Sequence, residues 1–460
     1  MLNRRQLLSR AAAGAAATLL APHRVFATPV SGSVMTASMR GSIDATDLGV
    51  RPGALDDQSK AFARMLQQAS DRDMPLFLPP GIYVVSNLNL PQRMRLSGVP
   101  GASRIVYGGD GHLMVAEDAD LIELSGIVID GANRWLRDDT QGLLDCHRAR
   151  NVAVDNCQFV GSGKNGIALE RSGGRIERSE ISGSADSGIY SVEGSGLQIT
   201  GNTVTDCANG GILVHRWQPA ADGTIVSGNR VARIAARNGG TGQYGNGINV
   251  FRANNVIVSG NVISDCAFTA VRANSASNIQ IAGNTCTGSG ETGIYSEFSF
   301  EGAIINGNVV DGAANGISIV NFNEGGRLAV CSANIVRNLH SEGPYVQDPP
   351  GFGVGISVEA DCSATGNVVE SVPLYGMQIG WGEFMRNVVA TGNVIRKAGT
   401  GIVVTVVEGT GSAVISDNMI DEVRDGAVVG YRWATPATGD LAIEGAGGYA
   451  NLTIERNRVT

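Results

Sequence analysis

The chain has 460 residues, 63 of them glycine, with 17% charged residues and a formal net charge of −8 at pH 7. This acidic balance excludes nucleic acid as the main partner, because phosphate binding needs a basic surface. The composition also excludes a disordered chain, and glycine at roughly twice its usual share predicts short strands joined by tight turns.

Residues 1–27 have the pattern of an export signal. Arg4 and Arg5 stand in the run Asn-Arg-Arg-Gln-Leu-Leu, and an alanine-rich apolar stretch follows over 11–21. This pattern resembles a twin-arginine signal, with small residues before a cleavage point after Ala27. The resemblance implies the twin-arginine export machinery as a partner and a periplasmic or secreted protein. The alternative is a short amphipathic helix of a cytoplasmic protein. No other run approaches ~18 apolar residues, so we expect no membrane span in the mature chain.

Residues 28–110 are expected to form an N-terminal cap and the first coils of a repeat structure. The segment 57–69 is predicted to be an amphipathic helix, with Phe62, Met65, Leu66 and Ala69 on one face. A helix over the open end of a solenoid keeps its terminal strand from pairing with other chains. The runs Leu-Pro-Pro-Gly-Ile-Tyr (78–83) and Leu-Ser-Gly (96–98) follow this helix.

Two short motifs recur through residues 111–460. The first places an asparagine between two apolar pairs, as in ITGNTV (199–204), VSGNRV (226–231), VSGNVI (258–263), IAGNTC (281–286), INGNVV (305–310), ATGNVV (364–369) and ATGNVI (390–395). Variants are VDNCQF (154–159), CSANIV (331–336), ISDNMI (415–420) and IERNRV (454–459). The second motif, Gly-Ile or a close variant opening an alternating strand, starts at 166, 188, 211, 247, 270, 293, 316, 355, 376, 401 and 426.

Most of these starts are 21–25 residues apart. A period near 23 residues with several short strands predicts an all-β fold, a single-stranded parallel β-helix. Stacked coils would share one core of inward Ile and Val, and the asparagines would bond between coils at one corner. The spaced leucines of leucine-rich solenoids and the GGxGxDx pattern of calcium-binding nonapeptide repeats are both missing.

The helix, the Leu-Pro-Pro-Gly-Ile-Tyr run and the repeats together resemble the pectate lyase and polygalacturonase-like (pectin lyase fold) superfamily. This resemblance implies a right-handed β-helix. The twin-arginine signal before such an array also resembles a family of exported bacterial β-helix repeat proteins of uncharacterised function. The superfamily's catalytic motifs are absent: Asp138-Asp139 lacks their context, and Gly111-His112 is followed by Leu113. The resemblance therefore implies a fold but assigns no catalytic residue.

The seven cysteines form no CxxC pair, which argues against a structural zinc site. We expect most of them to be small buried core residues. No metal site or cofactor is predicted; calcium is left open, because no clear site for it is present.

One face of the predicted β-helix gathers chemically active side chains. In each Gly-Ile strand the second and fourth residues after the glycine point outward, and successive coils lie about 4.8 Å apart. Two insertions, 232–246 and 337–354, leave just ahead of this face and are expected to stand beside it as walls. A third, 431–450, is expected to cap the C-terminal end. The face between the walls is therefore predicted to be an open groove.

Within this groove, Glu297 is the candidate general acid or base, with Arg272 shifting its pKa or binding a substrate carboxylate. Tyr295 and His215 are candidate bases for a lyase. Tyr295 and Glu297 are predicted to be exposed, since they face outward. Further residues suited to stacking on sugars or bonding their hydroxyls are Asn249, Arg252, Asn274, Asn321, Glu359, Trp381, Tyr244 and Tyr345.

Two hypotheses of different classes follow. The first is an exported enzyme that acts on a polysaccharide as a lyase or glycoside hydrolase. The second is an exported β-helix that binds glycans or envelope components without turnover. Polar residues on an outward strand are also what solubility requires, so each of them alone decides nothing.

Overall fold

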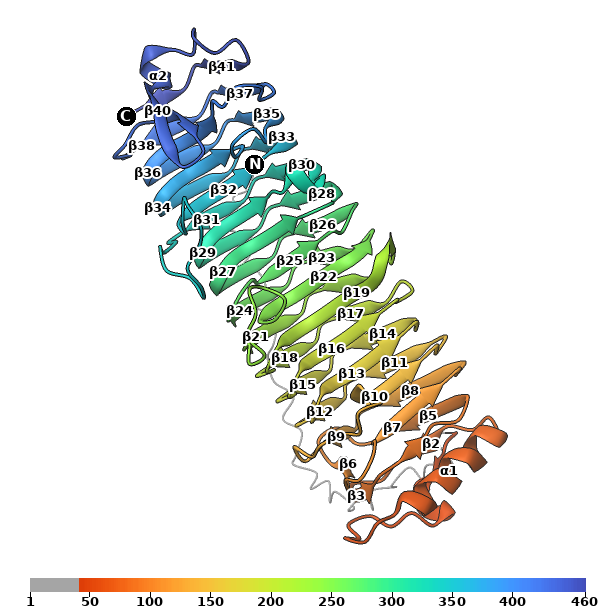
Figure 1. Ribbon diagram of the computed structural model, residues 1–460. Helices are drawn as coiled ribbons and strands as arrows, with labels where there is room; N and C mark the ends of the chain where they lie inside the picture. The colour runs from red at the N-terminus through yellow and green to blue at the C-terminus, as the bar shows by residue number, and fades with distance from the viewer. Residues whose placement is uncertain (1–40) are drawn as a thin grey trace, which may run out of the picture.

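The computed structural model describes residues 41–460 as one elongated parallel β-helix (Figure 1). The signal predicted at 1–27 lies outside the described residues. Each coil contributes strands to three sides, and every pairing between successive coils is parallel. The predicted all-β solenoid fold is confirmed. Within 41–460, no helix combines the length and apolarity that crossing a membrane would require.

The first side is a ladder of sixteen strands: β1 (Ile43–Asp44), β2 (Leu76–Phe77), β5 (Arg93–Ser97), β8 (Leu121–Ser125), β11 (Val152–Asp155), β14 (Gly174–Glu177), β17 (Gln198–Thr200), β20 (Ile225–Ser227), β23 (Ile257–Ser259), β26 (Ile279–Ala282), β28 (Glu301–Asn306), β30 (Arg327–Ser332), β33 (Ala360–Thr365), β35 (Arg386–Thr391), β37 (Ala413–Ser416) and β41 (Leu452–Glu455). The second side holds β3 (Gly81–Val85), β6 (Ser103–Tyr107), β9 (Val128–Asp130), β12 (Gln158–Val160), β15 (Glu180–Ser182), β18 (Thr203–Thr205), β21 (Arg230–Ile234), β24 (Val262–Cys266), β31 (Ile335–Arg337), β38 (Met419–Asp421) and β42 (Arg458–Val459).

The third side carries the Gly-Ile strands, and it is the face predicted to hold the groove. Its strands are β4 (Leu88–Asn89), β7 (Met114–Glu117), β10 (Gly142–His147), β13 (Asn165–Glu170), β16 (Ser187–Val192), β19 (Gly210–Ala221), β22 (Asn246–Asn254), β25 (Val271–Asn274), β32 (Val354–Val358) and β39 (Val428–Arg432). Four long strands cross from the second side to the third: β27 (Thr285–Glu297), β29 (Val309–Ile319), β34 (Val368–Ile379) and β36 (Val394–Thr405).

The recurring asparagines form a ladder at the corner between the first and second sides. Each asparagine side chain donates to the Oδ1 of the asparagine one coil ahead, at 2.9–3.1 Å. Its members are Asn202, Asn229, Asn261, Asn284, Asn308, Asn334, Asn367, Asn393, Asn418 and Asn457. Since these side chains are buried or nearly so, each amide depends on its neighbours in the stack and on nearby backbone carbonyls for its hydrogen bonds. The predicted corner is confirmed.

The glycine of the Gly-Ile motif is required by the close approach of successive coils. A Cβ added at Gly211 or Gly316 would lie 2.2 Å from the carbonyl oxygen of Gly247 or Gly355, respectively, in the next coil. The isoleucine that follows points inward and is fully buried; Ile212, Ile248, Ile294, Ile317 and Ile356 illustrate this stack. The motif therefore marks where a strand meets the coil above it.

The two ends of the solenoid are closed by different devices (Figure 1). Helix α1 (Ser59–Asp71) lies at the N-terminal end and buries the four predicted residues, Phe62, Met65, Leu66 and Ala69. At the C-terminal end, β40 (Thr435–Asp440) pairs antiparallel with β39, and the short helix α2 (Leu441–Glu444) follows. All seven cysteines are buried and none is in a disulfide, as the core interpretation predicts.

Candidate functional site

Both predicted insertions are loops at the corner between the second and third sides. The first loop, 235–245, joins β21 to β22, and the second, 338–353, joins β31 to β32. They lie over the third side instead of standing beside it. Arg272 Nη1 donates to the carbonyl of Gly242 in the first loop at 2.8 Å, and Tyr345 of the second loop donates to Glu291 at 2.6 Å. The two loops therefore both cover the middle coils, where Arg272 and Glu291 lie.

Arg272, Glu291 and Glu297 form a buried ionic network beneath these loops. Arg272 Nε lies 2.6 Å from Glu297 Oε1, and its Nη1 lies 3.4 Å from Glu291 Oε2. Asn274 donates to Glu297 at 2.9 Å, and the Thr269 hydroxyl donates to Glu291 at 2.8 Å. Each charge in the network is thus matched by partners within the protein.

The register predicted for the Gly-Ile strand that starts at residue 293 is confirmed, because Tyr295 pairs with Arg272 and Glu297 with Asn274. The predicted exposure of Glu297 is wrong: this residue is 4% exposed. Tyr295 is half-buried, and the Arg272 guanidinium lies 5.2 Å from its ring centroid. The cause is the loops, which cover a strip that strand periodicity alone leaves open. Burial raises the pKa of Glu297, while Arg272 opposes that shift.

An accessible pocket of about 190 Å³ opens beside this network, toward the C-terminal end. Four predicted site residues line it: Tyr295, Asn321, Glu359 and Trp381. Gln347 reaches it from the 338–353 loop, and its Oε1 is buried without a hydrogen-bond partner among residues 41–460. The remaining polar lining consists of amides and hydroxyls: Asn315, Ser318, Ser357 and Gln378. These groups suit hydroxyl-bearing ligands.

Glu359 is the chemically distinctive residue of this pocket. Its side chain follows β32 and is 9% exposed, and its Oε2 accepts a hydrogen bond from the Phe322 backbone N–H at 2.6 Å. Burial raises the pKa of Glu359 to about 7, although backbone hydrogen bonds from 321–322 oppose the shift. A carboxyl group that holds a proton near neutral pH is suited to general acid catalysis.

His215, Asn249 and Arg252 lie upstream of the pocket and do not line it. The His215 ring packs edge-on between Tyr190 and Phe251, with centroids 5.6 Å away in both cases, and its Nε2 is buried. Burial lowers its pKa to about 4. Arg252 lies over the Phe251 ring and donates to the Trp217 carbonyl. Asn249 is 6% exposed. The aromatic packing removes His215 from the groove.

Three other predicted residues have different placements. Asn274 belongs to the buried network, and Tyr345 anchors the 338–353 loop, stacking near Phe268 and Phe352. Tyr244 is half-buried in the 235–245 loop and lies outside the pocket lining. Glu291 was not identified as a site residue from the sequence, although its position just before the Gly-Ile motif of β27 could have indicated it. The sequence contains no comparable indication for Gln347, because the 338–353 loop lies outside the repeat pattern.

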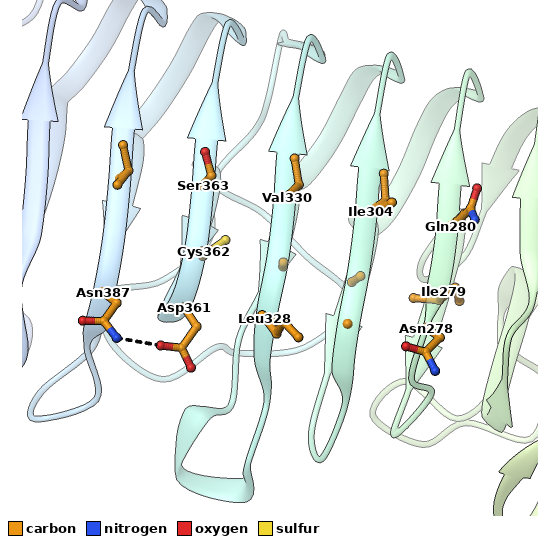
Figure 2. Close-up of a pocket in the computed structure, with 14 residues that line it drawn as sticks. Asn278, Ile279, Gln280, Ile304, Leu328, Val330, Asp361, Cys362, Ser363 and Asn387 are labelled. Carbon is orange, nitrogen blue, oxygen red and sulfur yellow. Dashed lines mark hydrogen bonds between the residues drawn. The ribbon is translucent and has the colours of Figure 1, made fainter.

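A larger cavity, about 600 Å³, lies on the first side over β26, β28, β30, β33 and β35 (Figure 2). Figure 2 shows Gln280, Ile304, Val330 and Ser363 on successive strands of this sheet. The carboxylate in its lining, Asp361, is already bonded to Asn387, Arg327 and Arg386. Chemistry therefore favours the smaller pocket on the third side. Among residues 41–460, no group of three His, Cys, Asp or Glu side chains is placed to hold a metal ion.

The fold defines a parallel β-helix protein with a lateral pocket. The chain belongs to the right-handed beta helix region family, whose model matches residues 125–326 and 220–386. This match also supports the predicted right-handedness. No curated protein sequence matches the chain.

Several solved structures are similar in fold. The catalytic unit of a thermostable GH87 alpha-1,3-glucanase from Streptomyces thermodiastaticus is 16% identical, with TM-score 0.47, covering 91% of this chain and 69% of that one. DFA-IIIase from Arthrobacter chlorophenolicus A6 is 14% identical, with TM-score 0.48 and coverages of 83% and 94%. An N-terminal fragment of bacteriophage phi29 gene product 12 is 14% identical, with TM-score 0.42, covering 84% of this chain and 65% of that one. This chain thus spans about two thirds of the phi29 chain.

Proposed function

We propose that this protein binds a polysaccharide along its third side and that Glu359 donates a proton to a glycosidic oxygen as the bond breaks. Water adds its hydroxyl to the anomeric carbon, and the proton that it releases restores the acid. The observation that carries the proposal is a carboxyl group, 9% exposed and with a pKa of about 7, that faces a pocket lined by Tyr295 and Trp381. A proton on Glu359 near neutral pH supplies the acid, and the two aromatic rings supply surfaces for a sugar.

The lining of the pocket favours uncharged sugars. It contains no arginine, lysine or histidine side chain, and its polar side chains are amides and hydroxyls apart from Glu359 and the Trp381 indole. Arg272, the cation predicted to bind a uronate carboxylate, is already bonded to Glu297 and Glu291 beneath the loops. Hydrolysis of a neutral polysaccharide therefore fits the pocket better than elimination from a uronate.

A second candidate function is glycan binding without turnover. The observation in its favour is that Glu359 is the one carboxylate in the pocket lining, whereas most glycoside hydrolases use a pair. Export by the twin-arginine machinery to the periplasm or the medium is part of both proposals, and it depends on Arg4 and Arg5. Envelope glycans would be the partner in the second case.

The test is a screen of neutral and acidic polysaccharides, measuring released reducing ends and unsaturated-uronate absorbance. We expect reducing ends from a neutral polysaccharide and a loss of activity of about 10²-fold or more in Glu359→Gln. Glu324→Gln, an exposed glutamate in the neighbouring turn, is the matched control and should retain full activity. Binding without products would support the second candidate, and absorbance from a uronate substrate would contradict the hydrolytic proposal.

A further inference from the structure

The third side carries a second polar cluster near its N-terminal end, at the outward positions of β10. Asp145 is 1% exposed; its Oδ2 accepts a hydrogen bond from the Gln141 backbone N–H at 2.7 Å, and its Oδ1 lies 3.1 Å from His147 Nε2. The other ring nitrogen, Nδ1, lies 3.4 Å from Glu170 Oε2 on the next coil. The hydrogen bond to Asp145 raises the pKa of His147, and Glu170 and Glu117 add to the shift. The imidazole is thus fixed between two carboxylates.

Two cavities, of about 370 Å³ and about 280 Å³, lie next to this cluster and share Asp145 and His147 in their linings. The first cavity is completed by His112, Glu117 and Arg137, among others, and the second by Glu170, Tyr190 and Trp217. Their sizes are near the lower end of the usual range for ligand pockets, about 300–1,000 Å³. A ligand that occupied both cavities would cross Asp145 and His147.

His112 in the first cavity points independently to a ligand. Its side chain is 6% exposed, and neither ring nitrogen has a hydrogen-bond partner within the part of the chain that the structure describes. Burial lowers the pKa of His112, and the nearby Arg137 adds to this effect. A neutral imidazole offers one donor and one acceptor, and buried polar groups of this kind are nearly always satisfied. A hydroxyl-bearing ligand in the cavity would supply the missing partner.

Trp217 in the second cavity is presented by an irregularity in β19. The register between β19 and β22 shifts between His215 and Ala220, because four residues of β19 stand opposite one residue of β22 there. The Trp217 backbone N–H donates to the Glu193 carboxylate at 2.7 Å, and the Arg171 guanidinium lies 4.6 Å from the indole ring centroid. The side chain nevertheless remains 46% exposed. A fixed and exposed indole is a suitable surface for stacking an apolar sugar face.

The wall of the first cavity is a third connection at the same corner, 131–141, between β9 and β10. It supplies Arg137, Asp139 and Thr140 to the lining. Lys164 donates from below to the carbonyls of Arg137, Asp138 and Thr140, at 2.9, 2.9 and 2.6 Å. The cavity is therefore held in shape by the protein, as a preformed binding site requires.

We propose that these two cavities are adjacent subsites of a second carbohydrate site, which binds an uncharged saccharide chain with its linkage over Asp145 and His147. The two linings contain both donors and acceptors, and a sugar hydroxyl can act as both. The linings hold four carboxylates, Glu117, Asp139, Asp145 and Glu170, against Arg137 and His147, so a uronate would be repelled. This site is independent of any activity at Glu359.

The test is calorimetric titration of the full chain with cellohexaose, laminarihexaose and maltohexaose as neutral probes and hexagalacturonate as the acidic one. We expect at least one neutral hexasaccharide to bind, with affinity lowered about tenfold or more in Trp217→Ala. Glu170→Gln should also weaken binding. This second variant shows whether a loss of affinity in Trp217→Ala reflects the site and not a structural effect of that one substitution. Trp135→Ala removes an indole that is 62% exposed on the 131–141 loop outside both linings, and it should leave affinity unchanged.

Glu359→Gln separates this proposal from the proposed function, because it should abolish turnover and leave this affinity unchanged. The second site is overturned if no neutral hexasaccharide binds, or if affinity in both Trp217→Ala and Glu170→Gln stays within about twofold of the parent. Tighter binding of hexagalacturonate that Trp217→Ala weakens would also overturn it, since the carboxylates would then not select against uronates.

Discussion

Glu359 shows how one side chain gains its chemistry from its position in the repeat. It occupies the outward position of its coil, two coils beyond Glu297, because Glu297 stacks toward Val320 and Val320 toward Glu359. In the earlier coil an arginine neutralises the glutamate, whereas at Glu359 only backbone N–H groups approach it. The same residue type is therefore an ion-pair partner in one coil and a candidate acid in the other.

The raised pKa of Glu359 predicts a pH-dependent stability. The folded protein binds this proton up to about pH 7, whereas a carboxyl with the ordinary pKa of 4.5 releases it earlier, so the unfolding free energy falls as pH rises through that window. The loss reaches about 3 kcal/mol above pH 7. Glu359→Gln cannot ionise, so we expect it to be more stable than the parent at pH 8 by up to about this amount.

Urea denaturation of both proteins at pH 4 and pH 8 measures the effect. As pH rises from 4 to 8, the free energy of unfolding of the parent should fall relative to that of Glu359→Gln. Glu324→Gln, on the exposed surface, should show a difference within about 0.5 kcal/mol at both pH values. A pH-independent difference for Glu359→Gln would contradict the prediction, because it would mean that Glu359 has the same pKa in the folded and unfolded states.

At the scale of elements, the asparagine ladder stabilises each coil through its neighbours. Asn284 accepts from both the backbone and side-chain N–H groups of Asn261, and it donates to Asn308 and to the Val258 carbonyl. Asn284→Ala would leave two buried donors of Asn261 without an acceptor, at a cost of about 2–5 kcal/mol. Asn306→Ala, at an exposed asparagine in the next coil, should cost less than about 0.5 kcal/mol.

Hydrogen exchange separates the local effect of Asn284→Ala from a general loss of stability. We expect faster exchange at the Asn261 amide and at the amides of the adjoining coils, because each coil contacts mainly its neighbours. Amides near α1 should keep their protection. Uniform loss of protection along the whole chain would instead show that the coils unfold as one unit.

The middle of the 338–353 loop is anchored by the charge-assisted hydrogen bond from Tyr345 to the buried Glu291 and by aromatic packing of the Tyr345 ring. Tyr345→Phe removes the hydroxyl and keeps the ring, so we expect a loss of about 1.5–3 kcal/mol in loop anchoring. Limited proteolysis should then cut within 338–353 sooner than in the parent. Tyr244→Phe, on the other loop, is the matched control, and its cleavage pattern should not change.

The sequence predicted the elements that depend on the repeat and missed those that depend on the loops. Gly316 and Asn284 are dictated by the neighbouring coil, so their spacing reveals side, register and corner directly. The burial of Glu297 depends on where the 235–245 and 338–353 loops come to rest, which no period encodes. The Asp145 cluster was missed because its coil has Leu143-Leu144 where the motif has Gly-Ile, although it lies one period before residue 166.

At the scale of the whole molecule, the third side is one continuous face on which both proposed sites lie. Eight register steps separate the coil of Asp145 from the coil that ends in Glu359. At about 4.8 Å per coil, the two sites are about 38 Å apart along the solenoid. The rigid ladder fixes that distance, so one polymer chain of sufficient length can occupy both sites at once.

This geometry predicts a threshold in affinity as the saccharide lengthens. Once one end is bound, the second site meets its ligand at a high effective concentration, and two linked sites can exceed either alone by about 10²-fold or more. Size fractions of a neutral polysaccharide that binds should therefore show a steep rise in affinity where the extended length passes about 38 Å.

Titration of immobilised Glu359→Gln, which should not degrade the ligand, measures this dependence. Trp217→Ala and Trp381→Ala each disable one site, so each should return the long fractions to the affinity of the short ones. A gradual increase with length that both variants retain would contradict simultaneous occupation, because the affinity would then come from repeated use of one site.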